Sequence, residues 1–249
     1  MATVSAYWRP ASIAQALELL DRPGAVAMGG GTAINASPPG DPVEVVDLQA
    51  LGLGAIEPAE GGRVVIGATT TLQALVDSGE APDLVREAAR CERPSTLRAQ
   101  ATIGGRVATG DPDSELLAAL LVHDAVVRVA GHGGVELPLP AVLAGLPLDA
   151  GRVVVAVTVG TGGRGASARV GRTPADTPIV AAYGRTGDAG TPGAGGRRIA
   201  LTGVAPTPVL VGGVEDVARL EPRGDFRGSA AYRLSLAATL VARVVEVLR

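Results

Sequence analysis

Lysine is absent from this chain of 249 residues, and all 22 of its basic side chains are arginine. That absence excludes a lysine Schiff base and the lysine of a P-loop nucleotide site. The single cysteine, Cys91, excludes disulfide bonds within the chain and a thiolate cage for zinc or an iron–sulfur cluster. Two histidines, His123 and His132, are too few for most transition-metal sites. The chain therefore depends on an organic cofactor, carboxylates, hydroxyls or backbone amides for any chemistry, and we expect no metal site in this chain alone.

Aromatic residues are also scarce, at 2% of a chain that is 47% hydrophobic, so aliphatic side chains must fill the core. The net charge of −3 argues against a nucleic acid or an anionic membrane as partner. The longest apolar runs, such as residues 116–122, are far shorter than the ~18 residues of a membrane span. Residues 1–10 lack the pattern of a secretory signal. We therefore expect a soluble, cytoplasmic protein with no membrane span.

Helix and strand patterns follow one another along the chain. They predict strands at 25–28, 43–48, 64–67, 126–130, 153–159, 198–204 and 209–211. They predict helices from Ser12, from Thr70 or Thr71 to about residue 76, at 83–90, from about 113 to 122, at 174–183, and at 229–248. Residues 91–101 are predicted to be irregular and 184–196 to form a mobile loop. Composition changes place domain boundaries near 51–62 and 160–171.

The first of two glycine clusters, Gly29-Gly30-Gly31-Thr32, follows a predicted strand directly. Glycines there let backbone N–H groups approach an anion, and threonine adds a hydroxyl donor. Asp47, at the end of the next strand, resembles the ribose-binding acid of a dinucleotide fold. The third glycine of that fingerprint is missing, because position 34 is Ile34, and no helix is predicted to follow. The pattern disfavours a nicotinamide site, and a plain tight turn remains the alternative to an anion site.

The second cluster, Thr102-Ile103-Gly104-Gly105, leads through Thr109 into a helix predicted to start near Asp113. Exposed amides beside a helix N-terminus favour anion binding. Asp111, Asp113 and Glu115 either cap that helix or accept hydrogen bonds from a ribose or a ring N–H. Two glycine loops could hold a pyrophosphate from both sides, which suits a large dinucleotide such as FAD.

A series of segments in fixed order carries a family resemblance over most of the chain. They are Tyr7-Trp8-Arg9-Pro10-Ala11-Ser12, Gly29-Gly30-Gly31-Thr32, Val45-Val46-Asp47-Leu48, Ile66-Gly67-Ala68-Thr69-Thr70-Thr71-Leu72, Ala101-Thr102-Ile103-Gly104-Gly105 with Asp111-Pro112, and Asp225-Phe226-Arg227-Gly228-Ser229 with Tyr232-Arg233. They resemble the FAD-binding medium subunit of the molybdenum hydroxylases, which include carbon monoxide dehydrogenase and bacterial xanthine dehydrogenase.

The resemblance implies an α+β fold class. Two α/β subdomains would form a vanillyl-alcohol-oxidase-like FAD-binding fold, with a small C-terminal α+β domain on the flavin side. Together with the composition changes, this predicts an N-terminal FAD-binding subdomain at 1–55, a second at 56–163 and the C-terminal domain at 164–249.

The resemblance also implies an oxidoreductase subunit that does not act on substrate alone. Its partners would be a large molybdenum-cofactor subunit and a small subunit with 2Fe–2S clusters, in a dimer of heterotrimers. Electrons would pass from molybdenum through the clusters to FAD, and then to NAD⁺, a quinone or another acceptor. The scarcity of Cys and His agrees, since the metals would lie in other subunits. The alternative is a flavin-free or weakly flavin-binding structural subunit of the same complex. A freestanding flavin oxidase is disfavoured, because no His or Cys precedes a flavin loop for covalent attachment.

The cofactor-binding residues that the resemblance implies come from both glycine clusters and from positions downstream. They are Met28, Gly29, Gly30, Gly31, Thr32, Ala33, Thr102, Ile103, Gly104, Gly105, Arg106, Thr109, Asp111, Glu115, Leu148 and Arg169. No catalytic acid or base and no metal ligand is assigned.

Some positions depart from the family pattern. Arg106 stands where asparagine is usual, and Glu115 stands where aspartate is expected. Residues 165–172 provide Arg169 but no aromatic side chain to shield the isoalloxazine. Pyrophosphate binding is therefore expected to be retained, with an altered isoalloxazine environment.

Individual side chains have competing interpretations. Thr32 and Thr102 are predicted phosphate contacts, and Arg106 either faces solvent or pairs with a flavin phosphate. Leu148 packs either on the isoalloxazine or in the core. The remaining residues are predicted to be structural: Arg169 at the surface, His123 and His132 at a helix end and in a loop, Cys91 as a buried small hydrophobe, and Tyr232 packed on the last helix with Leu236, Leu240, Val244 and Val247 on one stripe.

Overall fold

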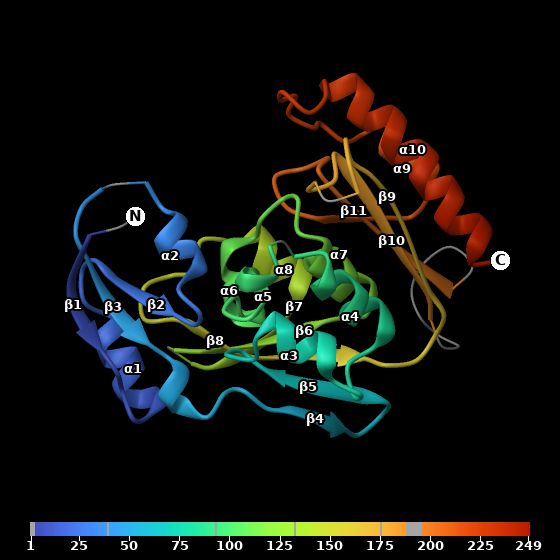
Figure 1. The fold of residues 1–249 in the computed structure, drawn as a ribbon. Coiled ribbons are helices and arrows are strands. Elements are labelled where there is room, and N and C mark those ends of the chain that lie inside the picture. Colours follow the sequence, from blue (N-terminus) through green and yellow to red (C-terminus); the bar gives the residue numbers. More distant parts are fainter. Residues whose placement is uncertain (1–2, 39, 93, 132, 175, 188–195) are drawn as a thin grey trace.

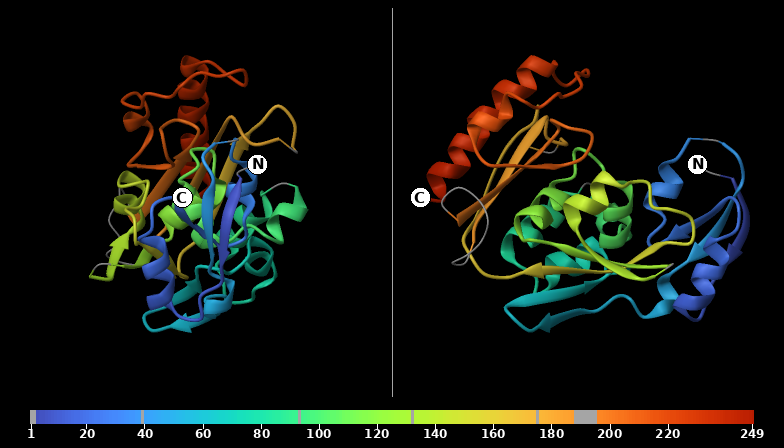
Figure 2. Two further views of the ribbon diagram at one scale, coloured as in Figure 1. Left: turned by 90° about the vertical axis from the view of Figure 1, so that its left-hand side faces the viewer. Right: turned by 180° about the vertical axis from the view of Figure 1, so that it is seen from behind.

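The computed structural model describes residues 3–38, 40–92, 94–131, 133–174, 176–187 and 196–249. These residues form three β-sheets, which follow one another along the chain (Figure 1). A five-stranded sheet lies beneath a layer of helices, with a three-stranded sheet at one end of the molecule and a four-stranded sheet at the other. The right-hand view of Figure 2 shows the same order of the three sheets from behind. The predicted α+β class is confirmed.

The N-terminal unit is a parallel sheet in the order β1-β3-β2 with one helix packed on it. Its elements are β1 (Val4–Trp8), α1 (Ile13–Leu20), β2 (Ala25–Met28), α2 (Thr32–Ala36), β3 (Val43–Asp47) and the 3₁₀ turn η1 (Gln49–Leu51). The helix predicted from Ser12 is confirmed: Ser12 is the N-cap of α1, and its hydroxyl accepts the Gln15 N–H at 3.2 Å. Strand β2 ends at Met28, so the first glycine cluster begins at the carboxyl end of a parallel strand, where α/β sheets commonly bind ligands.

The middle unit is an antiparallel sheet in the order β4-β5-β8-β6-β7, with its helices packed over one face. Its elements are β4 (Ile56–Ala59), β5 (Arg63–Gly67), α3 (Leu72–Asp77), α4 (Asp83–Arg90), α5 (Ser95–Arg98), α6 (Ile103–Thr109), α7 (Glu115–Val122), β6 (Val126–Ala130), β7 (Val135–Pro138), α8 (Leu139–Ala144) and β8 (Val153–Gly160). Sequence patterns missed β4, β7 and α8. They also treated 91–101 as irregular, whereas α5 lies within it.

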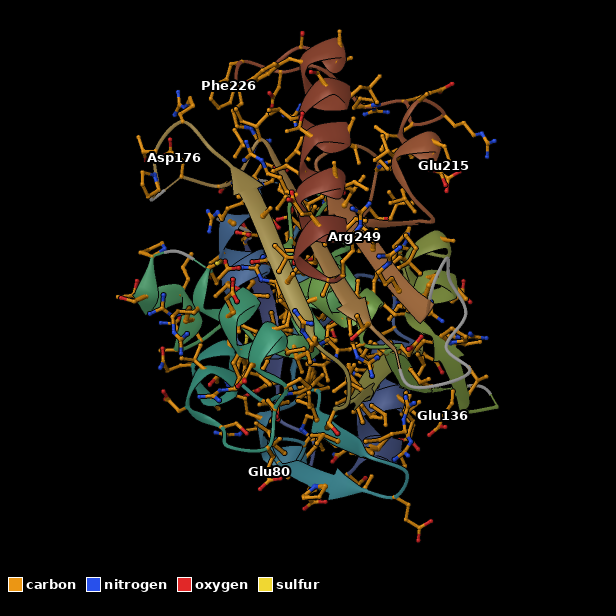
Figure 3. The ribbon with its side chains drawn as sticks, turned by 90° about the vertical axis from the view of Figure 1, so that its right-hand side faces the viewer. Glu80, Glu136, Asp176, Glu215, Phe226 and Arg249 are labelled. Atoms are coloured by element: carbon orange, nitrogen blue, oxygen red, sulfur yellow. The ribbon has the colours of Figure 1, made fainter. Side chains whose placement is uncertain are left out.

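The C-terminal unit is an antiparallel sheet in the order β12-β11-β10-β9. Its elements are β9 (Gly165–Val170), β10 (Val180–Thr186), β11 (Arg197–Thr202), β12 (Val209–Val211), α9 (Val214–Val217) and α10 (Ala230–Val247). Helix α10 lies across the outer face of the sheet, in front of the strands in Figure 3, and α7 packs against the inner face. No sheet crosses the predicted boundaries at 55 and 163, which stay a proposal for the division into domains.

The predicted helix at 174–183 is wrong, because β10 begins at Val180 and is an inner strand between β9 and β11. Ala181 and Tyr183 enter the core shared with α7, while Val180 and Ala182 enter the core beneath α10. A strand that is buried on both faces gives a continuous apolar run, which periodicity alone does not distinguish from a helix.

The predicted apolar stripe of α10 is also wrong at its ends. Tyr232 is 46% exposed and Val247 is 58% exposed, whereas Arg233 is buried with Leu240 and Val244. Arg233 points inward because its guanidinium donates to the backbone oxygen of Ile179 at 2.6 Å. The buried face of α10 therefore includes a charged residue, so hydrophobicity alone predicted the wrong residues for it.

None of the described helices has the length and apolarity needed to cross a membrane. His132, and residues 188–195 of the loop predicted at 184–196, lie outside the described residues.

Candidate functional site

The two glycine clusters, far apart in the sequence, are in direct contact. A Cβ placed on Gly30 would overlap the backbone carbonyl of Gln100, and one on Gly29 would overlap the Thr102 hydroxyl. Glycine is therefore required at both positions for the backbones to approach. The N-terminal and middle units meet at this contact.

A cleft of about 270 Å³ opens where the clusters meet. Its lining is Ala27, Met28, Gly29, Gly30, Gly31, Thr32, Ala33, Ile34, Ala36, Leu97, Ala101, Thr102, Gly105, Arg106, Ala108 and Thr109. Among the described residues of this lining, Arg106 is the one charged side chain and none is a carboxylate. Such a surface favours an anionic ligand.

Most of the residues predicted from sequence line this cleft. Gly104 and Leu148 instead line an adjoining cavity of about 70 Å³. Leu148 also packs against the large core. It therefore lies in the core, as one interpretation had it, and also faces the cavity beside the glycine clusters, as the other required. Ile103 is fully buried in that core and presents no side chain to the cleft.

The first cluster supplies the free backbone donors of the cleft. Gly31 has a φ of 73° and forms the N-cap of α2, a short helix that the sequence patterns did not predict. No hydrogen bond among the described residues engages the N–H groups of Gly30, Gly31, Thr32 or Ala33. The first N–H groups of a helix have no partner within it, so these donors are available to a ligand.

The second cluster differs from its predicted form as a loop with exposed amides. Thr102 is the N-cap of α6, and its hydroxyl accepts the Gly105 N–H at 3.2 Å. The Ile103 N–H donates to the Thr70 carbonyl at 3.0 Å, and the Gly104 N–H donates to the Ala68 carbonyl at 2.9 Å. This prediction is wrong because the amides anchor α6 to the segment after β5. The hydroxyl proton of Thr102 remains available to a ligand.

Arg106 connects the cleft to a second cavity of about 90 Å³, which Asp111 and Glu115 also line. Its guanidinium forms an ion pair with Glu92 and lies 4.0 Å from Asp111. The side chain is only 17% exposed, so the solvent-facing alternative is wrong. Burial raises the pKa of Glu92, and the charge of Arg106 opposes that rise.

Glu115 is engaged within the protein. It accepts a hydrogen bond from the Tyr183 hydroxyl at 2.9 Å and pairs with Arg169 at 3.2 Å. Burial raises the pKa of Glu115, and burial likewise raises that of Tyr183. Tyr183 was not singled out from the sequence, because nothing local distinguishes a tyrosine whose hydroxyl reaches from β10 to α7.

Arg169 and Cys91 also differ from their predicted environments. Arg169 is partly buried rather than on the surface, and it donates to the Cys91 sulfur at 3.1 Å and to the Asp176 carbonyl at 2.9 Å. Cys91 is therefore half-buried in a polar cluster rather than packed as a small hydrophobe. Burial raises the pKa of its thiol, as does the charge of Glu115.

Asp47 does not face the cleft as a ribose-binding acid would. Its carboxylate accepts the Tyr7 hydroxyl at 2.5 Å and the Gln49 N–H at 2.9 Å. The described residues contain no group of three or more His, Cys, Asp or Glu side chains that could hold a metal ion.

Residues 2–161 match the family described as the FAD binding domain in molybdopterin dehydrogenase. The chain belongs to this family. The resemblance inferred from the sequence is confirmed, and so is FAD as the expected cofactor.

Relatives of full length support the assignment. The chain is 33% identical over 255 residues to the uncharacterized protein YgfM of Escherichia coli (strain K12), covering 96% of this chain and 94% of that protein. It is 30% identical over 284 residues to the carbon monoxide dehydrogenase medium chain of Afipia carboxidovorans, covering 96% and 95%. Carbon monoxide dehydrogenase from Hydrogenophaga pseudoflava, solved without the Mo-pyranopterin moiety of its cofactor, gives a TM-score of 0.88 at 26% identity, covering 100% and 98%. The chain is thus homologous to the FAD subunit of an oxidoreductase complex, and the predicted FAD-binding fold is confirmed.

His123, the predicted helix-end residue, is the C-cap of α7. Its buried imidazole is expected to lower the free energy of unfolding at acid pH. Its Nδ1 lies 2.7 Å from the Gly160 carbonyl, and burial lowers its pKa from 6.5 to about 4. As pH falls below 6.5, the unfolded chain takes up the proton first, so stability is lost down to about pH 4. That pKa shift corresponds to a loss of ~3 kcal/mol in the free energy of unfolding.

We expect urea unfolding at neutral pH and near pH 4 to show this loss. His123→Gln keeps an N–H donor but cannot titrate, so its free energy of unfolding should fall ~3 kcal/mol less than that of the parent between neutral pH and pH 4. An equal fall in both proteins would show that His123 does not cause the pH dependence.

Proposed function

We propose that this chain is the FAD-binding electron-transfer subunit of a molybdenum-containing hydroxylase or dehydrogenase. It passes electrons from the 2Fe–2S clusters of a partner subunit through FAD to an external acceptor. The observation that carries the proposal is the joining of the two glycine clusters into one cleft without carboxylates, in a chain of this family. The full-length similarity to a carbon monoxide dehydrogenase medium chain supports the same role.

The residues present fit the diphosphate of FAD. N–H groups without a partner among the described residues follow one another from Gly30 to Ala33 along the lining of the cleft. Each charge-assisted hydrogen bond to a phosphate contributes ~1.5–3 kcal/mol. Thr32 and Thr102 also line the cleft, and each adds a hydroxyl donor.

FAD, when bound, supplies redox chemistry that links two-electron and one-electron carriers. The chain itself binds and orients the cofactor. Arg106, on α6, places a permanent cation in the wall of the cleft, and a guanidinium is a cation that phosphate oxygens readily accept hydrogen bonds from. Leu148 adds an apolar wall in the adjoining cavity. None of these residues has to exchange a proton in this role.

We further infer that the other subunits are a large molybdenum-cofactor subunit and a small 2Fe–2S subunit, in a dimer of heterotrimers. Support comes from the resemblance to medium chains and from a chain whose described residues offer no metal-binding cluster. Location in the cytoplasm stays a prediction.

Purification from the native host tests both parts of the proposal. We expect size-exclusion chromatography to give a complex of three polypeptides with molybdenum, iron and the absorption bands of oxidised flavin. A complex with both metals but no flavin would favour the structural-subunit alternative. A homo-oligomer free of molybdenum and iron would contradict the electron-transfer role.

A further inference from the structure

The segment 111–115 runs from the end of α6 to the first residue of α7, and three of its residues are tied to the C-terminal unit. The Gly203 N–H donates to the Pro112 carbonyl at 2.9 Å. The Arg227 Nη2 donates to Asp113 Oδ2 at 2.6 Å, and the Tyr183 hydroxyl donates to Glu115 as described. The segment is thus held by residues from β10 and from the loops after β11 and before α10.

Arg227 is itself held by a second carboxylate, Asp225, which a buried arginine holds in turn. Its Nε donates to Asp225 Oδ2 at 2.8 Å, and Asp225 Oδ1 accepts from Arg233 at 2.8 Å. Arg233 is nearly fully buried and also donates to the Gly203 carbonyl at 2.9 Å. Residue Gly203 therefore links the same network to Pro112. The side chains of Arg227 and Asp113 are both less than one-fifth exposed, so solvent screens their pairing only partly.

A short chain of contacts leads from this network to the cleft. The Asp113 N–H donates to Asp111 Oδ1 at 2.9 Å, and Asp111 Oδ2 lies 4.0 Å from the Arg106 guanidinium. Arg106 lines the cleft between the glycine clusters. A displacement of Asp113 therefore moves Asp111, and with it one of the two acidic partners that orient Arg106.

We propose that Arg227 is a positioning residue for the cofactor. It holds segment 111–115 in the arrangement that sets Arg106 at the cleft, so the C-terminal unit contributes to FAD affinity without Arg227 touching FAD. This inference rests on the proposed function, because it requires that the chain binds FAD.

Titration of the full-length apoprotein with FAD, followed by flavin fluorescence, tests the proposal. Arg227→Gln should raise the FAD dissociation constant on the order of tenfold, as is typical of coupled sites. Asp113→Asn should have a similar effect, and the double variant should be no weaker than either single variant, because both break one contact. Arg219→Gln is the matched control: it breaks an ion pair with Asp216 on a side chain that is 81% exposed, and should leave the constant unchanged.

Thermal unfolding of the apoproteins separates positioning from stability. A merely structural role lowers the unfolding midpoint but leaves the FAD dissociation constant unchanged at temperatures where every variant is folded. That result, or additive effects in the double variant, would overturn the proposal for Arg227. If the unsubstituted protein binds no FAD, the proposed function and this inference both fail. If it binds FAD and Arg227→Gln binds equally well, only this inference fails.

Discussion

Gly30→Val is expected to abolish detectable FAD binding and to destabilise the protein by at least ~3 kcal/mol. The new Cβ would overlap the backbone carbonyl of Gln100, which cannot rotate away as a flexible side chain could. The contact between the N-terminal and middle units would open, and the N–H groups after Gly30 would leave the cleft. Loss of two charge-assisted hydrogen bonds at ~1.5–3 kcal/mol each lowers FAD affinity at least about a hundredfold. Flavin content and urea unfolding measure the two effects.

Gly79→Val is the control, because nothing lies within 4 Å of a Cβ at Gly79 and its φ is not positive. It should leave flavin content and stability unchanged. Gly104→Val should also weaken FAD binding, but by moving α6, because its Cβ would come 2.7 Å from the Ala68 Cβ. No direct bond to FAD would be lost, because the Gly104 N–H donates to the Ala68 carbonyl. A Gly30→Val protein with parental stability and flavin content would show that the two clusters do not form the site.

Arg106→Asn is expected to weaken FAD binding about ten- to a hundredfold, or ~1.5–3 kcal/mol, because it removes from the wall of the cleft a permanent cation whose Nε has no partner among the described residues. The loss should shrink at high salt, which screens the partly exposed charge. Equilibrium titration with FAD at low and high ionic strength measures both. Stability should also fall, because Glu92 would stay buried without its ion-pair partner.

Glu92→Gln separates the two roles of Arg106. It removes the competing carboxylate and keeps the guanidinium, so FAD should bind at least as tightly as in the parent. In Arg106→Asn with Glu92→Gln, stability should recover while FAD binding stays weak. Full recovery of FAD binding in that double variant would show that Arg106 serves only to neutralise Glu92, and would remove it from the phosphate site.

Features with a local physical cause were predictable from the sequence. The helix starts at Ser12 and at Thr70 or Thr71 were predictable because hydroxyl side chains bond nearby backbone N–H groups, and the strand at 25–28 because a short apolar run ends in glycines. The first glycine cluster was recognisable because glycine directly after a strand permits close backbone approach. The segments that resemble the family could be ordered along the chain without any knowledge of their contacts.

Other features depend on which segments meet, and sequence periodicity carries no such information. Strand β10 was mistaken for a helix because burial on both faces removes the alternation that marks a strand. The inward position of Arg233 depends on backbone oxygens that other segments bring to it. Likewise, the ion pair of Arg106 with Glu92 and the contact of Glu115 with Tyr183 join residues whose separation gives no local signal.

The sequence by itself determined the family, the cofactor and the presence of two glycine clusters, because these depend on residue types in a fixed order. Only the tertiary structure decided which of the two clusters has backbone N–H groups available to a ligand. The amides of Ile103, Gly104 and Gly105 bond within the protein, whereas those from Gly30 to Ala33 have no partner among the described residues. A backbone N–H looks the same at every position of a sequence, and whether it remains available to a ligand depends on the acceptor that folding places opposite it.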